Sequence, residues 1–220
     1  MAELNKKVTW HMKKILFLLL LSLSQNHFFA QANSKFDKEP GVFSLGVRST
    51  FSAFNDGAEN KVGSGVGGQF RLRFSEKVNS DWFFDYLTSD IGNYAHRTDY
   101  HIGWSVLYYP LKNDLNLFKP YVLAGHCFDY SKIQANTNQL DYAERWSSAV
   151  QAGLGTHIRL TERLDLSVTA QYMCHLGQHL HAEWVNNQVN YFEEKGSSLE
   201  GHLLINASIN YKIGKLWGRK

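Results

Sequence analysis

The sequence has 220 residues, of which 20% are charged and 14% aromatic, with only three prolines. This length fits one domain or at most two, and its low proline and ample aromatic content argue against a disordered chain. Outside the first 32 residues, 19 basic residues face 19 acidic ones, a balance that argues against a nucleic-acid partner.

The first 32 residues have the order of a secretory signal peptide. Two lysines precede an apolar stretch over 15–23 that contains a single serine, and an Ala-Gln-Ala sequence closes the segment. A charged start, a short apolar core and a small-x-small ending indicate export, and the stretch is too short for a spanning helix of about 20 residues. We expect cleavage after Ala32, translation from Met12 with residues 1–11 a misassigned start, and one domain over 33–220.

From residue 41 onward, apolar and polar side chains alternate, which is the pattern of β-strands with one apolar face. Eight segments show it, each about as long as a tilted membrane strand requires. The predicted strands are 43–53, 66–75, 82–89, 99–108, 120–130, 146–160, 164–176 and 199–213. No helical pattern of useful length interrupts them, so we expect an all-β protein.

The fifth predicted strand is ambiguous. If Val122, Ala124 and Phe128 belong to its apolar face, His126 falls on that face as well. A β-bulge would shift the histidine to the polar side, so the sequence leaves the inward or outward assignment of this strand open.

The connections between the predicted strands alternate in length. Long polar segments are 55–64, 131–145 and 177–197, with 90–97 intermediate, 110–118 moderate, and 76–80 and 161–163 short. An even number of antiparallel strands can close into a barrel without free edges. Long loops on one rim and short turns on the other are the outer-membrane arrangement. We expect an eight-stranded antiparallel up-and-down transmembrane β-barrel.

Alternation alone does not say which face meets lipid, because a soluble lipocalin-like carrier turns its apolar face inward. Three features favour the membrane barrel. The polar face is rich in Gly and Ser, which suit a crowded interior; its charges are balanced, as buried charges must be; and aromatic residues gather near the strand ends, as in membrane girdles. Cys127 and Cys174 then lie on different strands and opposite faces, and we expect two free thiols.

The chain from about 41 to 213 resembles the small eight-stranded outer-membrane β-barrel family, the OmpA- and OmpX-like barrels of Gram-negative bacteria. The segments that carry the resemblance are Pro120-Tyr121-Val122-Leu123-Ala124-Gly125, Ala152-Gly153-Leu154-Gly155 and the alternating last strand near Tyr211. The resemblance implies residence in the outer membrane, contact with its lipid and lipopolysaccharide, and insertion by the barrel-assembly machinery. One departure is that the chain continues past Tyr211 to Lys220.

Charged residues on the polar face form the candidate site. We expect them to make a salt-bridged network that plugs the lumen, because eight strands leave an interior that side chains can fill. The predicted members are Arg48, Arg71, Arg73, Asp85, Asp99, Asp129, Arg159, Glu200 and Lys212, with Asp165 on the same face. We expect no cofactor and no passage of large solutes.

Two chemical alternatives are weak. His179, His181 and Glu183 share a face of an extended segment and could bind zinc, yet the spacing matches no closed zinc pattern. A barrel hydrolase needs a Ser–His–acid arrangement, but Ser208 and His202 lie six residues apart on one strand, about 20 Å. We therefore expect no catalytic residues.

These patterns together predict an integral outer-membrane barrel, and the family resemblance implies a structural, adhesive or ligand-contact role through its extracellular loops. The loop aromatic residues Tyr142, Trp146, Trp184, Tyr191 and Phe192 are candidates for a partner surface. The alternatives are a lipid-modifying barrel enzyme and a soluble periplasmic carrier.

Overall fold

The computed structural model describes residues 39–54, 62–111, 117–195 and 201–217. Within them lie ten β-strands. Their bounds are β1 Val42–Phe54, β2 Val62–Arg73, β3 Val78–Ile91, β4 Ala95–Tyr108, β5 Phe118–Ala135, β6 Tyr142–Arg159, β7 Leu164–Leu176, β8 Gln178–Val185, β9 Gln188–Lys195 and β10 Gly201–Lys215. In the described part of the chain, no helix is long and apolar enough to cross a membrane.

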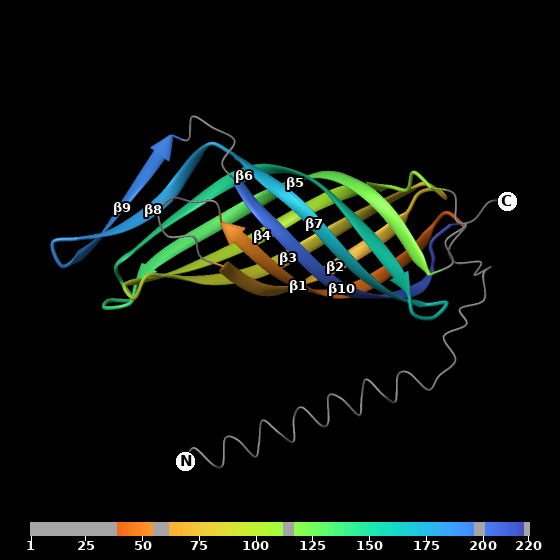
Figure 1. Cartoon of the computed structure of the whole chain (residues 1–220), viewed down its shortest axis with the longest axis horizontal. Coiled ribbons are helices and arrows are strands. Elements are labelled where there is room, and N and C mark those ends of the chain that lie inside the picture. Colours follow the sequence, from red (N-terminus) through yellow and green to blue (C-terminus); the bar gives the residue numbers. More distant parts are fainter. Residues whose placement is uncertain (1–38, 55–61, 112–116, 196–200, 218–220) are drawn as a thin grey trace, which may run out of the picture.

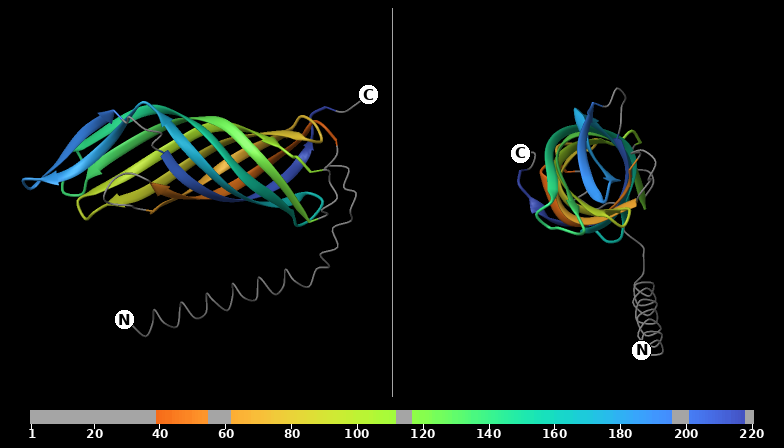
Figure 2. Two further views of the ribbon diagram at one scale, coloured as in Figure 1. Left: turned by 45° about the horizontal axis from the view of Figure 1, so that its top comes forward. Right: turned by 90° about the vertical axis from the view of Figure 1, so that its left-hand side faces the viewer.

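Eight of the strands close into a barrel, in which β1 to β7 follow one another and β10 lies between β7 and β1 (Figure 1). Every neighbouring pair is antiparallel, and the view along the barrel shows the closed ring (Figure 2). The predicted eight-stranded up-and-down barrel is thus confirmed, although some strand limits differ from the predicted ones, most of all at β5 and β6, which extend to Ala135 and from Tyr142.

The connection predicted over 177–197 is not a loop but contains a β-hairpin. Strands β8 and β9 pair from Gln178 and Lys195 to Val185 and Gln188, and positive φ angles at Asn186 and Asn187 make the turn. Asparagine adopts this left-handed conformation more readily than most residues. The predicted loop over 131–145 is also largely strand, because β5 and β6 stay paired up to Gln134 and Tyr142.

The two ends of the barrel differ. One end, here called the terminal end, holds Glu39, Trp217 and the connections 74–77 and 160–163. The opposite end, here called the hairpin end, carries the turns 92–94 and 136–141 and the β8–β9 hairpin (Figure 1).

The apolar face of the barrel points outward. Leu203 and Ile205 are 44% and 48% exposed, whereas Arg71 is 5% exposed and points into the interior. This is the reverse of a soluble ligand-binding barrel and the arrangement of a barrel whose outer wall meets lipid. The lipocalin-like alternative is therefore not favoured.

Strand β5 keeps strict alternation without a bulge. Its register with β4 and β6 is continuous from Val122 to Gln134. His126 consequently faces outward, where its Nε2 lies 2.6 Å from Ser148 Oγ and its ring packs edge-on against Phe128. A hydrogen bond between two polar side chains lowers the cost of placing each on an apolar surface, which resolves the ambiguity of this strand.

Aromatic side chains form a band near each end of the outer wall. Toward the hairpin end, four strands contribute a continuous row, with ring centroids 5.2 Å apart for Tyr86–Tyr100, 5.9 Å for Tyr100–Tyr130 and 5.0 Å for Tyr130–Trp146. At the terminal end, Phe43 packs on Phe70 and Phe74 stacks on Trp217. Aromatic rings favour the two interfaces of a bilayer, and bands near both ends of the outer wall match this preference.

Both cysteines are free and buried. Cys127 faces the interior, while Cys174 lies on the same face of β7 as the outward residues Tyr172 and Leu176. The predicted pair of free thiols is confirmed.

Candidate functional site: the barrel interior and the hairpin end

An ion pair crosses the middle of the barrel. Arg48 Nε on β1 lies 3.0 Å from Asp85 Oδ1 on β3, and both side chains are buried. The Arg48 guanidinium also lies 4.5 Å from the centroid of the Phe83 ring. Because an unpaired buried charge is costly, this contact ties β1 to β3 across the intervening β2.

A second network fills the interior toward the terminal end. Arg71 donates two hydrogen bonds to Asp81, at 2.6 and 3.0 Å, and its Nη1 lies 3.3 Å from His157 Nδ1. His157 Nε2 in turn lies 2.8 Å from Tyr109 Oη, which also accepts a hydrogen bond from Asn79 at 2.6 Å. Asp81 was absent from the predicted set because the third strand was expected to begin at residue 82.

A third network lies toward the hairpin end. Arg97 Nε is 3.0 Å from both carboxylate oxygens of Asp99. His101 Nε2 and His175 Nδ1 approach the two oxygens of Asp129, at 3.3 and 3.4 Å. The sequence placed both aspartates inside the barrel but missed Arg97, which falls in a segment expected to be a loop.

Two buried apolar clusters also lie in the barrel interior. One buried cluster joins Phe83, Cys127, Ala149, Met173 and Leu204, and a second joins Leu107, Tyr109, Tyr121 and Leu123. Small residues opposite make room for the large ones: a Cβ at Gly103 would lie 2.6 Å from the Phe83 ring, and one at Gly155 would lie 2.4 Å from Tyr121.

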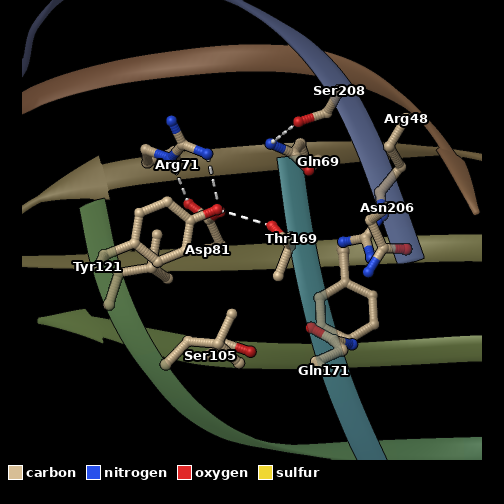
Figure 3. Close-up of a pocket in the computed structure, with 13 residues that line it drawn as sticks. Arg48, Gln69, Arg71, Asp81, Ser105, Tyr121, Thr169, Gln171, Asn206 and Ser208 are labelled. Carbon is tan, nitrogen blue, oxygen red and sulfur yellow. Dashed lines mark hydrogen bonds and ion pairs between the residues drawn. The ribbon is translucent and has the colours of Figure 1, made fainter. Parts of the chain in front are cut away.

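A cavity in the interior has a volume of about 20 Å³ (Figure 3). Figure 3 shows Arg71 reaching Asp81, Tyr121 bonded to Thr169 at 2.7 Å, and Gln69 bonded to Ser208 at 3.2 Å around it. A volume of this size has room for about one water molecule. This cavity is therefore too small to hold an organic ligand.

The other charged residues predicted to line the lumen lie near the terminal end or outside the residues that the structure describes. Lys212 Nζ is 3.1 Å from Asp165 Oδ1 and also donates to the carbonyl of Glu162 at 3.3 Å. Arg73 is buried at the last position of β2, and Arg159 is partly exposed at the last position of β6. Glu200 lies outside the described residues.

The predicted histidine–carboxylate group is only partly described. His181 stacks on Phe192 across the hairpin, with ring centroids 5.4 Å apart, and Glu183 is exposed on the same strand. The His179 side chain lies outside the description. Within the described part, no group of three or more His, Cys, Asp or Glu residues is arranged to hold a metal ion.

Serine and histidine side chains lie close together at several places, but not in the arrangement of a catalytic triad. In a triad the histidine uses one ring nitrogen for the serine and the other for the carboxylate. Ser147 Oγ and Asp129 Oδ2 both approach Nδ1 of His175, each at 3.4 Å. His157 contacts Ser167, Tyr109 and Arg71 rather than a carboxylate. Ser208 is bonded to Gln69 and Asn210 inside the barrel.

The hairpin folds back onto the mouth of the barrel. Leu180 of β8 is buried with Ala95 and Ile133 in an apolar cluster. Tyr94 Oη donates to the carbonyl of Ala182 at 3.2 Å, and Tyr191 Oη donates to the carbonyl of Asp141 at 2.8 Å. Burial raises the pKa of Tyr191, with a further contribution from Asp141, so the phenol stays protonated and keeps this hydrogen bond at neutral pH.

Large apolar side chains are exposed around the hairpin end. Leu140 at the β5–β6 turn is 86% exposed, and Trp184 and Phe192 of the hairpin are 43% and 38% exposed. Of the other predicted loop aromatics, Trp146 belongs to the aromatic band and Tyr191 packs against the apolar cluster under the hairpin.

Comparisons with known proteins agree with this geometry. Residues 15–212 match the family model described as outer membrane protein beta-barrel domain. The outer membrane protein OprG from Pseudomonas aeruginosa is similar in structure, with 16% identity, a TM-score of 0.51 and coverage of 80% of this chain and 97% of that one. Neisserial surface protein A has 13% identity, a TM-score of 0.50 and coverage of 80% and 99%. No curated protein sequence matches the chain.

Proposed function

The chain belongs to the outer membrane protein β-barrel family, and from this premise we propose that it is a plugged envelope protein that makes contacts outside the cell through its hairpin end. In this proposal the protein neither conducts large solutes nor catalyses a reaction. The outer-membrane location follows from the family, and the contact role is the proposed part.

The observation that carries the proposal is the way the hairpin end is built. Leu180 packs into the mouth of a barrel that already holds three bonded side-chain networks, while Trp184 and Phe192 remain exposed on the same hairpin. Long exposed segments on a rigid scaffold are common places for binding. Exposed apolar side chains beyond the lipid-facing band are available to a partner rather than to the bilayer.

The orientation follows from the topology. Eight strands bring both ends of the barrel chain to the terminal end, and in outer-membrane barrels the short turns face the periplasm. The hairpin end then faces outward from the cell. In this orientation outer-leaflet lipopolysaccharide is a neighbour of the wall below the hairpin. From the family we further propose that the barrel-assembly machinery inserts the chain.

Export is proposed to depend on a cleaved signal over residues 1–32, which leaves 33–220 as the mature chain. Edman sequencing of the protein purified from outer membranes should begin at Asn33. A mature chain that starts at Met1 or Met12 would contradict this assignment.

Cell retention on octyl-coated beads tests the contact role. Cells that express the wild-type chain are compared with cells that express Trp184→Ser/Phe192→Ser, which removes exposed apolar surface from the hairpin. A matched control is Phe74→Ser, because Phe74 is 49% exposed but lies at the terminal end. We expect the hairpin variant alone to lose retention by several fold.

Membrane fractionation and gel mobility must first show that each variant is inserted. A folded barrel should sediment with the outer membrane and shift in mobility on boiling. Equal retention of the hairpin variant and the Phe74 variant would count against a contact role for the hairpin.

A further inference from the structure

A polar pair lies within the apolar outer wall of the barrel. His126 of β5 and Ser148 of β6 both point outward, and the Nε2 atom of His126 lies 2.6 Å from Ser148 Oγ. Their neighbours on the wall are apolar, because Phe128 is 55% exposed and Val150 is 43% exposed. Since this wall meets lipid, the His126–Ser148 pair faces the bilayer as well.

The pair has one more hydrogen-bond donor than its own bond uses. An imidazole carries at least one N–H and a serine carries one O–H, whereas the bond between Nε2 and Oγ uses a single hydrogen atom. If the serine donates, an N–H on Nδ1 remains, and if the histidine donates, the serine O–H remains. Among the described contacts of His126 and Ser148, none supplies an oxygen or nitrogen acceptor for this second donor.

Two other outward hydroxyl groups find an acceptor within the chain. Ser49 Oγ donates to the carbonyl of Gly65 at 3.3 Å, and Thr156 Oγ1 donates to the carbonyl of His157 at 3.5 Å. In the hydrocarbon of a bilayer no water can take this part, and a polar group without a partner is costly there. For the His126–Ser148 pair, an acceptor from outside the described residues would recover that cost.

The depth of the pair indicates what this acceptor is. Tyr130 and Trp146 are paired across β5 and β6 and belong to the aromatic band toward the hairpin end. Ser148 follows Trp146 by two residues toward the terminal end, which is about 5 Å along the barrel axis for a tilted strand. Because aromatic bands lie at headgroup level, the pair lies just inside the hydrocarbon, where ester groups join acyl chains to the headgroups.

We propose that the His126–Ser148 pair binds the ester carbonyl of a lipid acyl chain in the leaflet at the hairpin end. A carbonyl oxygen accepts hydrogen bonds and donates none, which fits the one remaining donor. Lipid covers this wall wherever the barrel is inserted, so the acceptor is always at hand. Naming that leaflet as the outer one rests on the orientation proposed above. The binding itself depends neither on that orientation nor on the contact role of the hairpin.

Two lipids that differ only in their carbonyl groups test the site. The protein purified from outer membranes is titrated in detergent micelles with ester-linked dimyristoyl phosphatidylethanolamine and, separately, with its ether-linked analogue of the same chain length. Native mass spectrometry measures how much of each lipid stays bound. We expect the wild type to bind the ester lipid about fivefold more tightly, which is the scale of one hydrogen bond in lipid.

The test variant is His126→Phe/Ser148→Ala, which removes both donors and leaves the wall apolar. The matched control is Thr156→Val, which removes an outward hydroxyl of the same strand whose hydrogen is already donated to a backbone carbonyl. We expect the double variant to lose the preference for the ester lipid and the control to keep it. Both variants are first checked for the mobility shift on boiling.

Equal binding of the two lipids by the folded wild type would refute the site, and this comparison needs no variant to fold. A preference that survives in the double variant would place carbonyl binding elsewhere on the wall. A dimer that appears in the wild-type spectrum and is lost in the double variant would make a second copy of the chain, and not a lipid, the partner of this pair.

Discussion

At the scale of single residues, the interior depends on pairs that lie far apart in sequence. Arg48 and Asp85 are separated by a whole strand, yet both are buried and lie 3.0 Å apart. A lone charge at that position would have no water to solvate it. The stability of this part of the barrel therefore depends on both side chains being present.

Arg48→Met should destabilise the barrel by about 3–5 kcal/mol, because it leaves the Asp85 carboxylate buried without its partner. The double variant Arg48→Met/Asp85→Asn should recover most of this loss. Urea titration in lipid vesicles, followed by tryptophan fluorescence, measures both. A double variant no more stable than the single one would show that the ion pair is not what stabilises this part of the interior.

Leu154 tests the outer wall at the same scale. It lies in the second half of β6, is 65% exposed and points outward. Leu154→Arg should cost about 2–4 kcal/mol if the residue meets the bilayer midplane.

Leu140→Arg is the control, because Leu140 is exposed on the β5–β6 turn beyond the aromatic band. Its stability should match that of the wild type in the same vesicles. Comparable losses at the two positions would mean that the wall at Leu154 does not face lipid.

At the scale of elements, β8 and β9 are the two strands of the described chain that lie outside the barrel sheet. Its position depends on Leu180 in the apolar cluster with Ala95 and Ile133, together with two tyrosine hydrogen bonds. These contacts are few compared with the ladders of the barrel. The hairpin is therefore expected to open at a lower free energy than the barrel unfolds.

Leu180→Asp should detach the hairpin from the mouth, because an ionised carboxylate in an apolar cluster is strongly unfavourable. The barrel itself should stay folded and keep its mobility shift. Limited proteolysis of intact cells with chymotrypsin should cut the hairpin of this variant at least tenfold faster than that of the wild type.

Val185→Asp serves as the matched substitution, because Val185 lies at the hairpin tip and is 39% exposed. It should leave the cleavage rate within about twofold of the wild type. If both variants are cleaved equally fast, the Leu180 contact does not hold the hairpin in place.

At the scale of the whole molecule, three bonded networks and two buried apolar clusters fill the interior. An eight-stranded barrel has an interior just wide enough for side chains to fill. A closely packed interior of this kind resists deformation of the barrel wall.

Planar-bilayer recordings should show no large, stable conductance steps from the purified protein, because the side-chain networks leave no wide water-filled path. A variant that removes a pair of filling groups from the terminal half, Arg71→Ser/Asp81→Ser, should raise the measured current if it folds. Large steady steps from the wild type would contradict a plugged interior.

Much of this architecture was predictable because a bilayer requires strict alternation. Each of the eight barrel strands carries an apolar outer face, and the positions of Arg48, Arg71 and Asp85 on the inner face follow from the same period of two. Beyond the lipid, the outer face no longer has to be apolar, so alternation fades. For this reason, the parts of β5 and β6 at the hairpin end and the whole β8–β9 hairpin were predicted to be loops.

The sequence by itself determined which side chains face inward. Alternate residues of a strand face opposite sides, and the side that meets lipid must be apolar. Only the tertiary structure decided which of them meet. The Arg71–Asp81 and Arg48–Asp85 pairs, the two histidines at Asp129 and the apolar cluster around Phe83 all depend on the stagger between strands. That stagger is fixed by the closure of the whole sheet, which no single strand encodes.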